Sequence, residues 1–224
     1  MGASFTLADS QTLEDLQVFL ARAARIEEGS VRLIAGSGVL AVYIAVFYPQ
    51  GLLDESPTVL GLRTVALVPG ADGTADTFDA VVPVRSLLGR IDTAKTTGST
   101  AISLPMEVNT ATWAAISPPK GGWHASGSTT APVLDAVARS GIDEVAAAIP
   151  TGTGEQIVRR VRSEVWSRPI PGLEHVPAGA GFAALGLGFL GDDEVRIFET
   201  GPWTRLTTQR GHVLVKRKAW TLAR

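Results

Sequence analysis

Glycine-rich stretches that lead into apolar or basic segments are the parts of this 224-residue chain whose spacing could support chemistry. Residues 178–198, AGAGFAALGLGFLGDDEVRIF, contain G-x-G-x-x-A and then G-x-G-x-x-G, the spacing of a turn that holds a dinucleotide pyrophosphate. That fingerprint also needs a strand before the first glycine and a helix after it. Two prolines precede Gly179, and the second match runs into an acidic turn. We therefore interpret the stretch as a close-packed helix and expect no cofactor.

A second glycine site, TGTG at residues 151–154, leads directly into a basic helix. The unpaired amides and the positive dipole end of a helix N-terminus can hold an anion. The candidate anion-binding or nucleic-acid-binding residues here are Gly152, Thr153, Gly154, Arg159, Arg160 and Arg162. The P-loop pattern G-x-x-x-x-G-K-[ST] does not occur, so nucleotide hydrolysis is not indicated. The simpler alternative, which we favour, is an ordinary helix start followed by a solvated arginine face.

The C-terminal segment WTRLTTQRGHVLVKRK, residues 203–218, is predicted to be a basic β-hairpin. Its cations Arg205, Arg210, Lys216 and Lys218 could contact phosphates, and helices ahead of a basic hairpin loosely follow the order of a winged helix-turn-helix. Charges that protect an edge strand from aggregation are the simpler interpretation. Residues 151–224 carry 11 basic and 7 acidic side chains, against 9 and 15 in residues 1–150. Such an asymmetry indicates either an anionic partner or docking of two parts of one molecule.

No catalytic constellation is recognisable in the sequence. There is no G-x-S-x-G pattern, the three histidines are far apart, and the chain has no cysteine, which excludes a thiolate nucleophile and a Cys-ligated metal. We therefore predict no catalytic residue and no metal site, and lean against an enzyme. Trp123 and His124, in KGGWH, are candidate binding residues on an exposed loop. The alternative for the tryptophan is a ring that tucks back onto its own domain.

The elements that position these residues follow from apolar spacing and turn residues. A helix is predicted over residues 10–30, with Thr12 and Asp15 as a capping pair. Two strands within 31–49 are joined by glycines at 35–38. The run 39–48, VLAVYIAVFY, is apolar without alternation, which predicts a central strand or a subunit interface. It is too short to span a bilayer, which takes about 20 residues.

These patterns predict an α+β protein. Residues 1–116 form a mostly antiparallel sheet with flanking helices, and the proline- and glycine-rich residues 117–131 form a linker or long loop. Residues 132–224 form a helical part that ends in a β-hairpin or small antiparallel sheet. Helices are expected at 131–141, 142–150, 154–166 and 178–190.

Four segments together resemble a protein family of unknown function from high-GC Gram-positive bacteria: VLGLRTVALV, DAVVPVRSLLGRI, EVWSRP and GPWTRLTTQRGHVLVKR. That resemblance transfers no activity, cofactor or catalytic residue. The order helix, strands, FDAVVPVRSLLGRI is also similar to a sliding-clamp-type unit, in which V-P-x-x-x-L-L joins a strand to a helix. The similarity implies a fold and not a function. No basic central channel is expected, because this part of the chain is net negative.

Three functional hypotheses are open. The first is a non-catalytic cytoplasmic protein that binds a protein partner, or itself through strand 39–48. The second is a binder of nucleic acid or of a phosphate-bearing ligand through the basic C-terminal part, and the third is an enzyme on an unrecognised scaffold. The N-terminus lacks the basic and apolar segments of a signal peptide, so we expect a soluble cytoplasmic protein without membrane contact.

Overall fold

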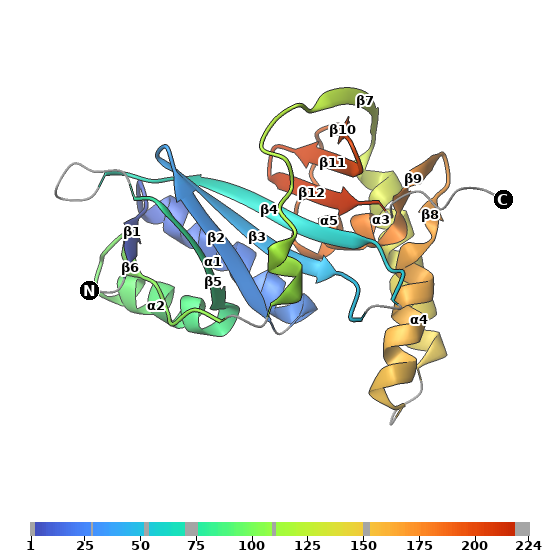
Figure 1. Cartoon of the computed structure of the whole chain (residues 1–224), viewed down its shortest axis with the longest axis horizontal. Helices are drawn as coiled ribbons and strands as arrows, with labels where there is room; N and C mark the ends of the chain where they lie inside the picture. The colour runs from blue at the N-terminus through green and yellow to red at the C-terminus, as the bar shows by residue number, and fades with distance from the viewer. Residues whose placement is uncertain are drawn as a thin grey trace. The chain divides into compact units, whose positions relative to one another are not determined.

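The computed structural model describes residues 3–27, 29–51, 54–69, 76–108, 111–149 and 153–217 (Figure 1). Its contacts divide the chain into unit 1, residues 1–45 and 62–116, and unit 2, residues 46–61 and 117–224. Helices and antiparallel strands are mixed in both units, which confirms the predicted α+β class. The predicted bounds at 116 and 132 stay a prediction, and the place of residues 46–61 in unit 2 was not foreseen.

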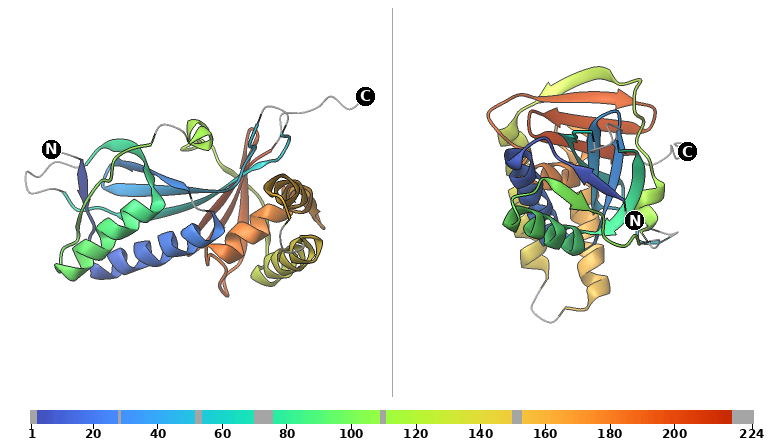
Figure 2. Two further views of the ribbon diagram at one scale, coloured as in Figure 1. Left: turned by 90° about the horizontal axis from the view of Figure 1, so that it is seen from below. Right: turned by 90° about the vertical axis from the view of Figure 1, so that its left-hand side faces the viewer.

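Unit 1 is an antiparallel sheet with two helices on one face (Figure 2). Its strand order is β5 (Phe78–Pro83), β2 (Ser30–Gly36), β3 (Val39–Phe47) and β4 (Thr58–Ala66), and the last residues of β3 and the first of β4 belong to unit 2. Its helices are α1 (Ser10–Ile26) and α2 (Val84–Thr96). A short pair, β1 (Ser4–Thr6) with β6 (Ala101–Ser103), and the 3₁₀ turn η1 (Thr112–Ala115) complete the unit.

The helix, the hairpin and the strand-to-helix junction of unit 1 follow the sequence pattern. α1 buries one apolar stripe, as predicted, but its N-cap is Asp9, whose carboxylate accepts a hydrogen bond of 2.7 Å from the amide of Thr12. Ser37 and Gly38 both have positive φ in the turn between β2 and β3, as a two-residue hairpin requires. β5 runs directly into α2 at Pro83, as the resemblance to a clamp-type unit implied. β3 lies between β2 and β4, so its apolar run is a central strand.

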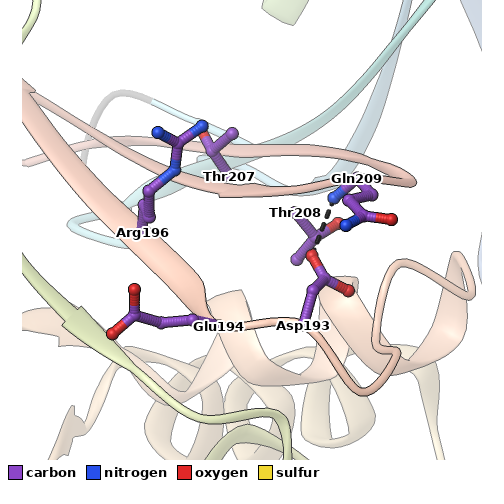
Figure 3. A pocket seen from close by; sticks show the side chains of 6 residues that line it. All are labelled: Asp193, Glu194, Arg196, Thr207, Thr208 and Gln209. Atoms are coloured by element: carbon purple, nitrogen blue, oxygen red, sulfur yellow. Dashed lines mark hydrogen bonds between the residues drawn. The ribbon is translucent and has the colours of Figure 1, made fainter.

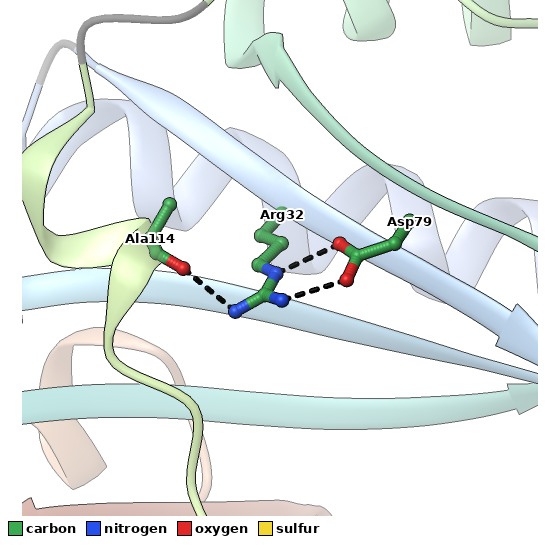
Figure 4. Close-up of polar contacts among 3 residues, drawn as sticks. All are labelled: Arg32, Asp79 and Ala114. Atoms are coloured by element: carbon green, nitrogen blue, oxygen red, sulfur yellow. Dashed lines mark hydrogen bonds and ion pairs between the residues drawn. The ribbon is translucent and has the colours of Figure 1, made fainter.

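A half-buried arginine holds η1 against the sheet of unit 1 (Figure 4). Arg32 on β2 forms two hydrogen bonds, of 2.8 and 2.7 Å, with the carboxylate of Asp79 on β5, and donates a third of 2.7 Å to the carbonyl of Ala114. The hydrogen bond to Asp79 is the main reason why the pKa of Arg32 is raised above its ordinary value. The bidentate geometry fixes the direction of the side chain.

Unit 2 contains the remaining strands of the same eight-stranded sheet, with helices on one face (Figure 2). Its strand order is β4, β12 (Gly211–Lys216), β11 (Trp203–Thr208), β10 (Val195–Thr200) and β7 (His124–Thr129). The helices are α3 (Ala131–Ala148), α4 (Glu155–Ser167) and α5 (Ala178–Gly186). The strands β8 (Pro169–Ile170) and β9 (Leu173–Pro177) form a separate small pair.

Two sequence-based expectations for unit 2 require correction. The segment 117–131, expected to be a linker or long loop, contains β7, which pairs with β10. Its side chains are small and mostly exposed, so the apolar alternation that indicates a strand is missing. The two helices expected at 131–141 and 142–150 are the single helix α3. Gly141 does not break it, because the ring of Trp166 packs against that glycine.

The glycine-rich stretch at 178–190 is a helix, as predicted, although it ends at Gly186. A Cβ on Gly181 would lie 2.9 Å from the carbonyl oxygen of Leu134 on α3, and a Cβ on Gly179 would lie 3.1 Å from the carbonyl oxygen of Trp166. The rings of Trp166 and Phe182 stack with their centroids 4.5 Å apart. The glycines therefore allow α5 to approach its neighbouring segments closely.

Candidate functional site

The sheet of unit 2 has one face that packs on helices and one that carries arginine and aromatic side chains. Successive side chains of a strand alternate between the faces. Ile197 lies opposite Leu206, both are 1% exposed, and α5 contacts the neighbouring strand β12. Phe198 lies opposite Arg205 on the other face, and Arg196, two residues before Phe198, shares it.

Four side chains of this second face form what we call the arginine–aromatic cluster: Trp123, Arg196, Phe198 and Arg205. The guanidinium carbon of Arg205 lies 4.6 Å from the ring centroid of Trp123 and 4.7 Å from that of Phe198. The guanidinium of Arg196 lies 5.6 Å from the Phe198 centroid. The indole N–H of Trp123 donates a 3.1 Å hydrogen bond to the carbonyl of Pro119, four residues earlier in the same segment. Cation–π contacts of this kind are worth about 0.5–2 kcal/mol each.

The positive charge of the cluster is not neutralised by a neighbouring acid. Within the residues that the structure describes, Arg196 and Arg205 form no ion pair. The Nε of Arg205 is buried without a hydrogen-bond acceptor. Burial, and then the charge of Arg196, lower the pKa of Arg205 from its ordinary value. Two guanidinium groups without counter-ions on one face favour an anion there.

A shallow pocket of about 260 Å³ adjoins Arg196 (Figure 3). It is lined by Asp193, Glu194, Arg196, Thr207, Thr208 and Gln209. Its two carboxylates accept hydrogen bonds from neutral donors: Asp193 accepts one of 2.8 Å from the amide of Gln209, and Glu194 accepts one of 2.6 Å from the hydroxyl of Ser128. Arg196 is therefore the cation of a pocket that also carries two negative charges.

His212 is a neutral group beside the cluster. Its Nδ1 lies 3.1 Å from the hydroxyl oxygen of Thr207. Burial, and then the charge of Arg205, lower the pKa of His212 from 6.5 to about 4. The imidazole is therefore uncharged at neutral pH, and the charge of this face comes from its arginines.

The depressed pKa of His212 predicts a loss of stability in acid. Between pH 6.5 and about 4 the unfolded chain binds a proton that the folded chain does not, so the free energy of unfolding falls as the pH decreases through this window. His212→Gln is expected to reduce the shift in urea midpoint between pH about 7 and about 4.5. His124→Gln is the control, because it makes the same side-chain change at an exposed residue. An equal shift in wild type and His212→Gln would contradict the assignment.

The described residues of the candidate anion site around α4 are distributed from the start of the helix along its length. Thr153 and Gly154 precede the helix, and Gly154 is its N-cap. Arg159 pairs with the glutamate one turn before it, and Arg160 lies 3.9 Å from the glutamate one turn after it. Arg162 is half-buried and forms no ion pair within the described part of the chain. Most of this charge is therefore balanced along the helix, in line with the simpler interpretation.

The other predicted residues are spread over the sheet of unit 2. Arg210 donates a 2.9 Å hydrogen bond to a backbone oxygen. Lys216 shares a sheet face with Arg205, and His124 begins β7 as an exposed residue. Gly152 and Lys218 lie outside the described residues.

Of the predicted residues, the structure brings together Trp123 and Arg205, and it adds two that the sequence analysis missed. Arg196 and Phe198 stand two residues apart in VRIFET, with the apolar Ile197 between them. That alternation on a strand places both on the face opposite Ile197. This alternation was a signal in the sequence that could have pointed to both residues. It does not show which strand pairs with them.

Two negative observations concern the described residues alone. They contain no group of three or more His, Asp or Glu side chains placed to hold a metal ion. Among the helices that the structure describes, none combines the length and apolarity that crossing a membrane requires.

Both parts of the chain match protein families of unknown function. Residues 1–114 match the model described as Domain of unknown function (DUF8010), and residues 118–220 match Domain of unknown function (DUF8185). No curated protein matches the chain significantly. The predicted resemblance to a family of unknown function is therefore confirmed, and its bacterial group stays a prediction.

Crystal structures of DNA polymerase III subunits share the fold. For the beta subunit of Pseudomonas aeruginosa the TM-score is 0.51 at 16% identity, over 99% of this chain and 66% of that one. For pol III beta of Caulobacter crescentus the TM-score is 0.50 at 11% identity, over 98% of this chain and 67% of that one. For a structure described as the DNA polymerase sliding clamp from Pseudomonas aeruginosa with ligand, the TM-score is 0.47 at 16% identity, over 98% of this chain and 66% of that one. The chain thus spans about two thirds of the length of these proteins, and the similarity shows the fold alone.

Proposed function

We propose that this chain, which belongs to the family of the domain of unknown function DUF8010, is a non-catalytic binding protein whose arginine–aromatic cluster attracts an acidic region of a protein partner. The observation that carries the proposal is the pair of guanidinium groups, Arg196 and Arg205, that no acid neutralises within the described residues. An exposed carboxylate of a partner supplies the missing counter-charge. Charge-assisted hydrogen bonds of this kind contribute about 1.5–3 kcal/mol each.

The fold supports a binding role in the setting of DNA metabolism. The solved structures that share it belong to DNA polymerase III subunits, and a cytoplasmic location next to that machinery is part of the proposal. Because a fold alone does not determine a function, the proposal rests mainly on the arginine–aromatic cluster. Self-association through β3 is less favoured, because β3 is a central strand.

Nucleic-acid binding is the second candidate, favoured by the excess of basic residues in the C-terminal part. Within residues 153–217, five described cations form no ion pair: Arg162, Arg196, Arg205, Arg210 and Lys216. Five phosphate contacts predict a loss of affinity of about 500-fold between 50 and 200 mM salt, against 10³–10⁵ for six to ten contacts. The rings of Trp123 and Phe198 each already have the guanidinium of Arg205 over them, which leaves less ring surface for stacking with bases.

The test compares an acidic peptide with DNA on the full chain. A fluorescein-labelled polyglutamate peptide and a duplex oligonucleotide are titrated at low salt, and anisotropy is recorded. The double variant Arg196→Ala/Arg205→Ala is expected to weaken peptide binding at least about tenfold.

The matched control is Arg159→Ala/Arg160→Ala, which removes the same charge from residues that already pair with glutamates. Peptide binding should survive this change. If both double variants weakened peptide binding equally, the attraction would be a general electrostatic one and the proposal would be contradicted. Tight duplex binding that depends on Arg162 and Lys216 would favour the second candidate instead.

A further inference from the structure

The outer edge of β7 is unpaired, and apart from a bulge at Ser126 it lacks the usual protective residues. β7 is the last strand in the order of its sheet, so among the described residues no strand pairs with its outer side. Its sequence, HASGST, contains no proline, lysine or carboxylate, the residues by which edge strands normally prevent further pairing. All of its residues except the last are exposed. An edge of this kind is a template for another extended segment.

The neighbouring strand supplies a charge that selects the segment. Arg196 lies opposite Ser128 across the pair of β10 and β7. A strand added outside β7 would lie about 10 Å from β10, a distance that an arginine and a glutamate side chain span together. The side chains of Ala125 and Ser128 on the arginine-bearing face are small, and the Ser128 hydroxyl donates a 2.6 Å hydrogen bond to the carboxylate of Glu194, which an incoming carboxylate must pass. Arg205, further inward, adds positive charge through its contact with Phe198.

We propose that β7 is a strand-addition site for an extended acidic peptide segment of a protein partner, with backbone hydrogen bonds to β7 and a carboxylate on Arg196. This rests on the proposed function and specifies how the partner binds. The backbone pairing gives affinity, and Arg196 selects a carboxylate at one position on the arginine-bearing face. A neutral extended segment would lack the carboxylate that pairs with Arg196. An acidic helix would lack free backbone amides, because they are used in its own hydrogen bonds.

The probe is an alternating (Glu-Val)₄ peptide, titrated by fluorescence anisotropy into the full chain. Two further peptides keep every side chain but carry backbone N-methyl groups, one on the odd-numbered and one on the even-numbered residues. In an added strand one of these sets of amides points at β7 and the other at solvent. One N-methylated peptide is therefore expected to bind at least about tenfold more weakly, while the other retains binding. Arg196→Ala should weaken the unmethylated peptide by a similar factor.

The outcomes separate this inference from the proposed function. If both N-methylated peptides bind equally well and still require Arg196, the strand-addition model is wrong and the cluster still binds an acidic partner. If no acidic peptide binds, or binding ignores Arg196 and Arg205, the proposed function fails as well. If no peptide binds but the chain dimerises, and Ser126→Lys abolishes the dimer, the edge belongs to a second copy and the proposal is overturned.

Discussion

Replacing Gly181 by alanine is expected to lower the free energy of unfolding of unit 2 by about 1–3 kcal/mol. The new Cβ would lie 2.9 Å from the carbonyl oxygen of Leu134, closer than such atoms approach. Because the neighbour is the backbone of α3 and not the end of a flexible side chain, α5 and α3 must move apart. The gain in helix propensity, about 0.5–1 kcal/mol, offsets only part of this cost. The urea midpoint followed by far-ultraviolet circular dichroism measures the change.

Gly89→Ala is the matched control, because it makes the same change inside a helix without any close neighbour. Gly89 lies in α2 and is exposed, and the Cβ of an alanine there would meet no neighbouring atom within 4 Å. This variant should raise the midpoint, by about 0.5–1 kcal/mol in stability. If Gly181→Ala were equally stabilising, the close approach of α5 to α3 would be refuted.

Much of unit 1 could be predicted because its signals are local. The apolar spacing of α1, the turn at Ser37 and Gly38, and the junction of β5 with α2 each depend on residues close together in sequence. The V-P-x-x-x-L-L pattern also indicated the fold that the polymerase subunits share. The N-cap was misplaced by three residues, because both Asp9 and Thr12 are good cap residues and only the structure shows which one accepts the amide.

Unit 2 was harder to predict because its signals depend on distant neighbours. β7 is made of small polar residues and becomes a strand only through its pairing with β10, about 70 residues later. Gly141 resembled a helix end, whereas it is the place where the ring of Trp166 packs on α3. The cluster joins side chains that are far apart in the sequence. Its members Trp123 and Arg205 were candidates separately, and nothing in the sequence indicated their contact.

Trp166→Ala is expected to cause the largest loss of stability, about 3–5 kcal/mol. The indole is 2% exposed, stacks on Phe182 and packs against Gly141 of α3. Its removal leaves a cavity among α3, α4 and α5 that the surrounding helices cannot fill. The urea midpoint should fall steeply, and the pH dependence assigned to His212 should remain, because that residue lies on the other face of the sheet.

A double-mutant cycle with Gly141→Ala tests the specific contact. In the wild-type chain this alanine overlaps the Trp166 ring and should cost about 1–3 kcal/mol. In the Trp166→Ala background the ring is gone, and the same alanine should stabilise α3 by about 0.5–1 kcal/mol through its helix propensity, although Val165 remains 3.2 Å away. A reversal in the sign of the stability change would show that glycine at position 141 makes space for the indole. Additive effects of the two substitutions would show that the glycine and the tryptophan act independently.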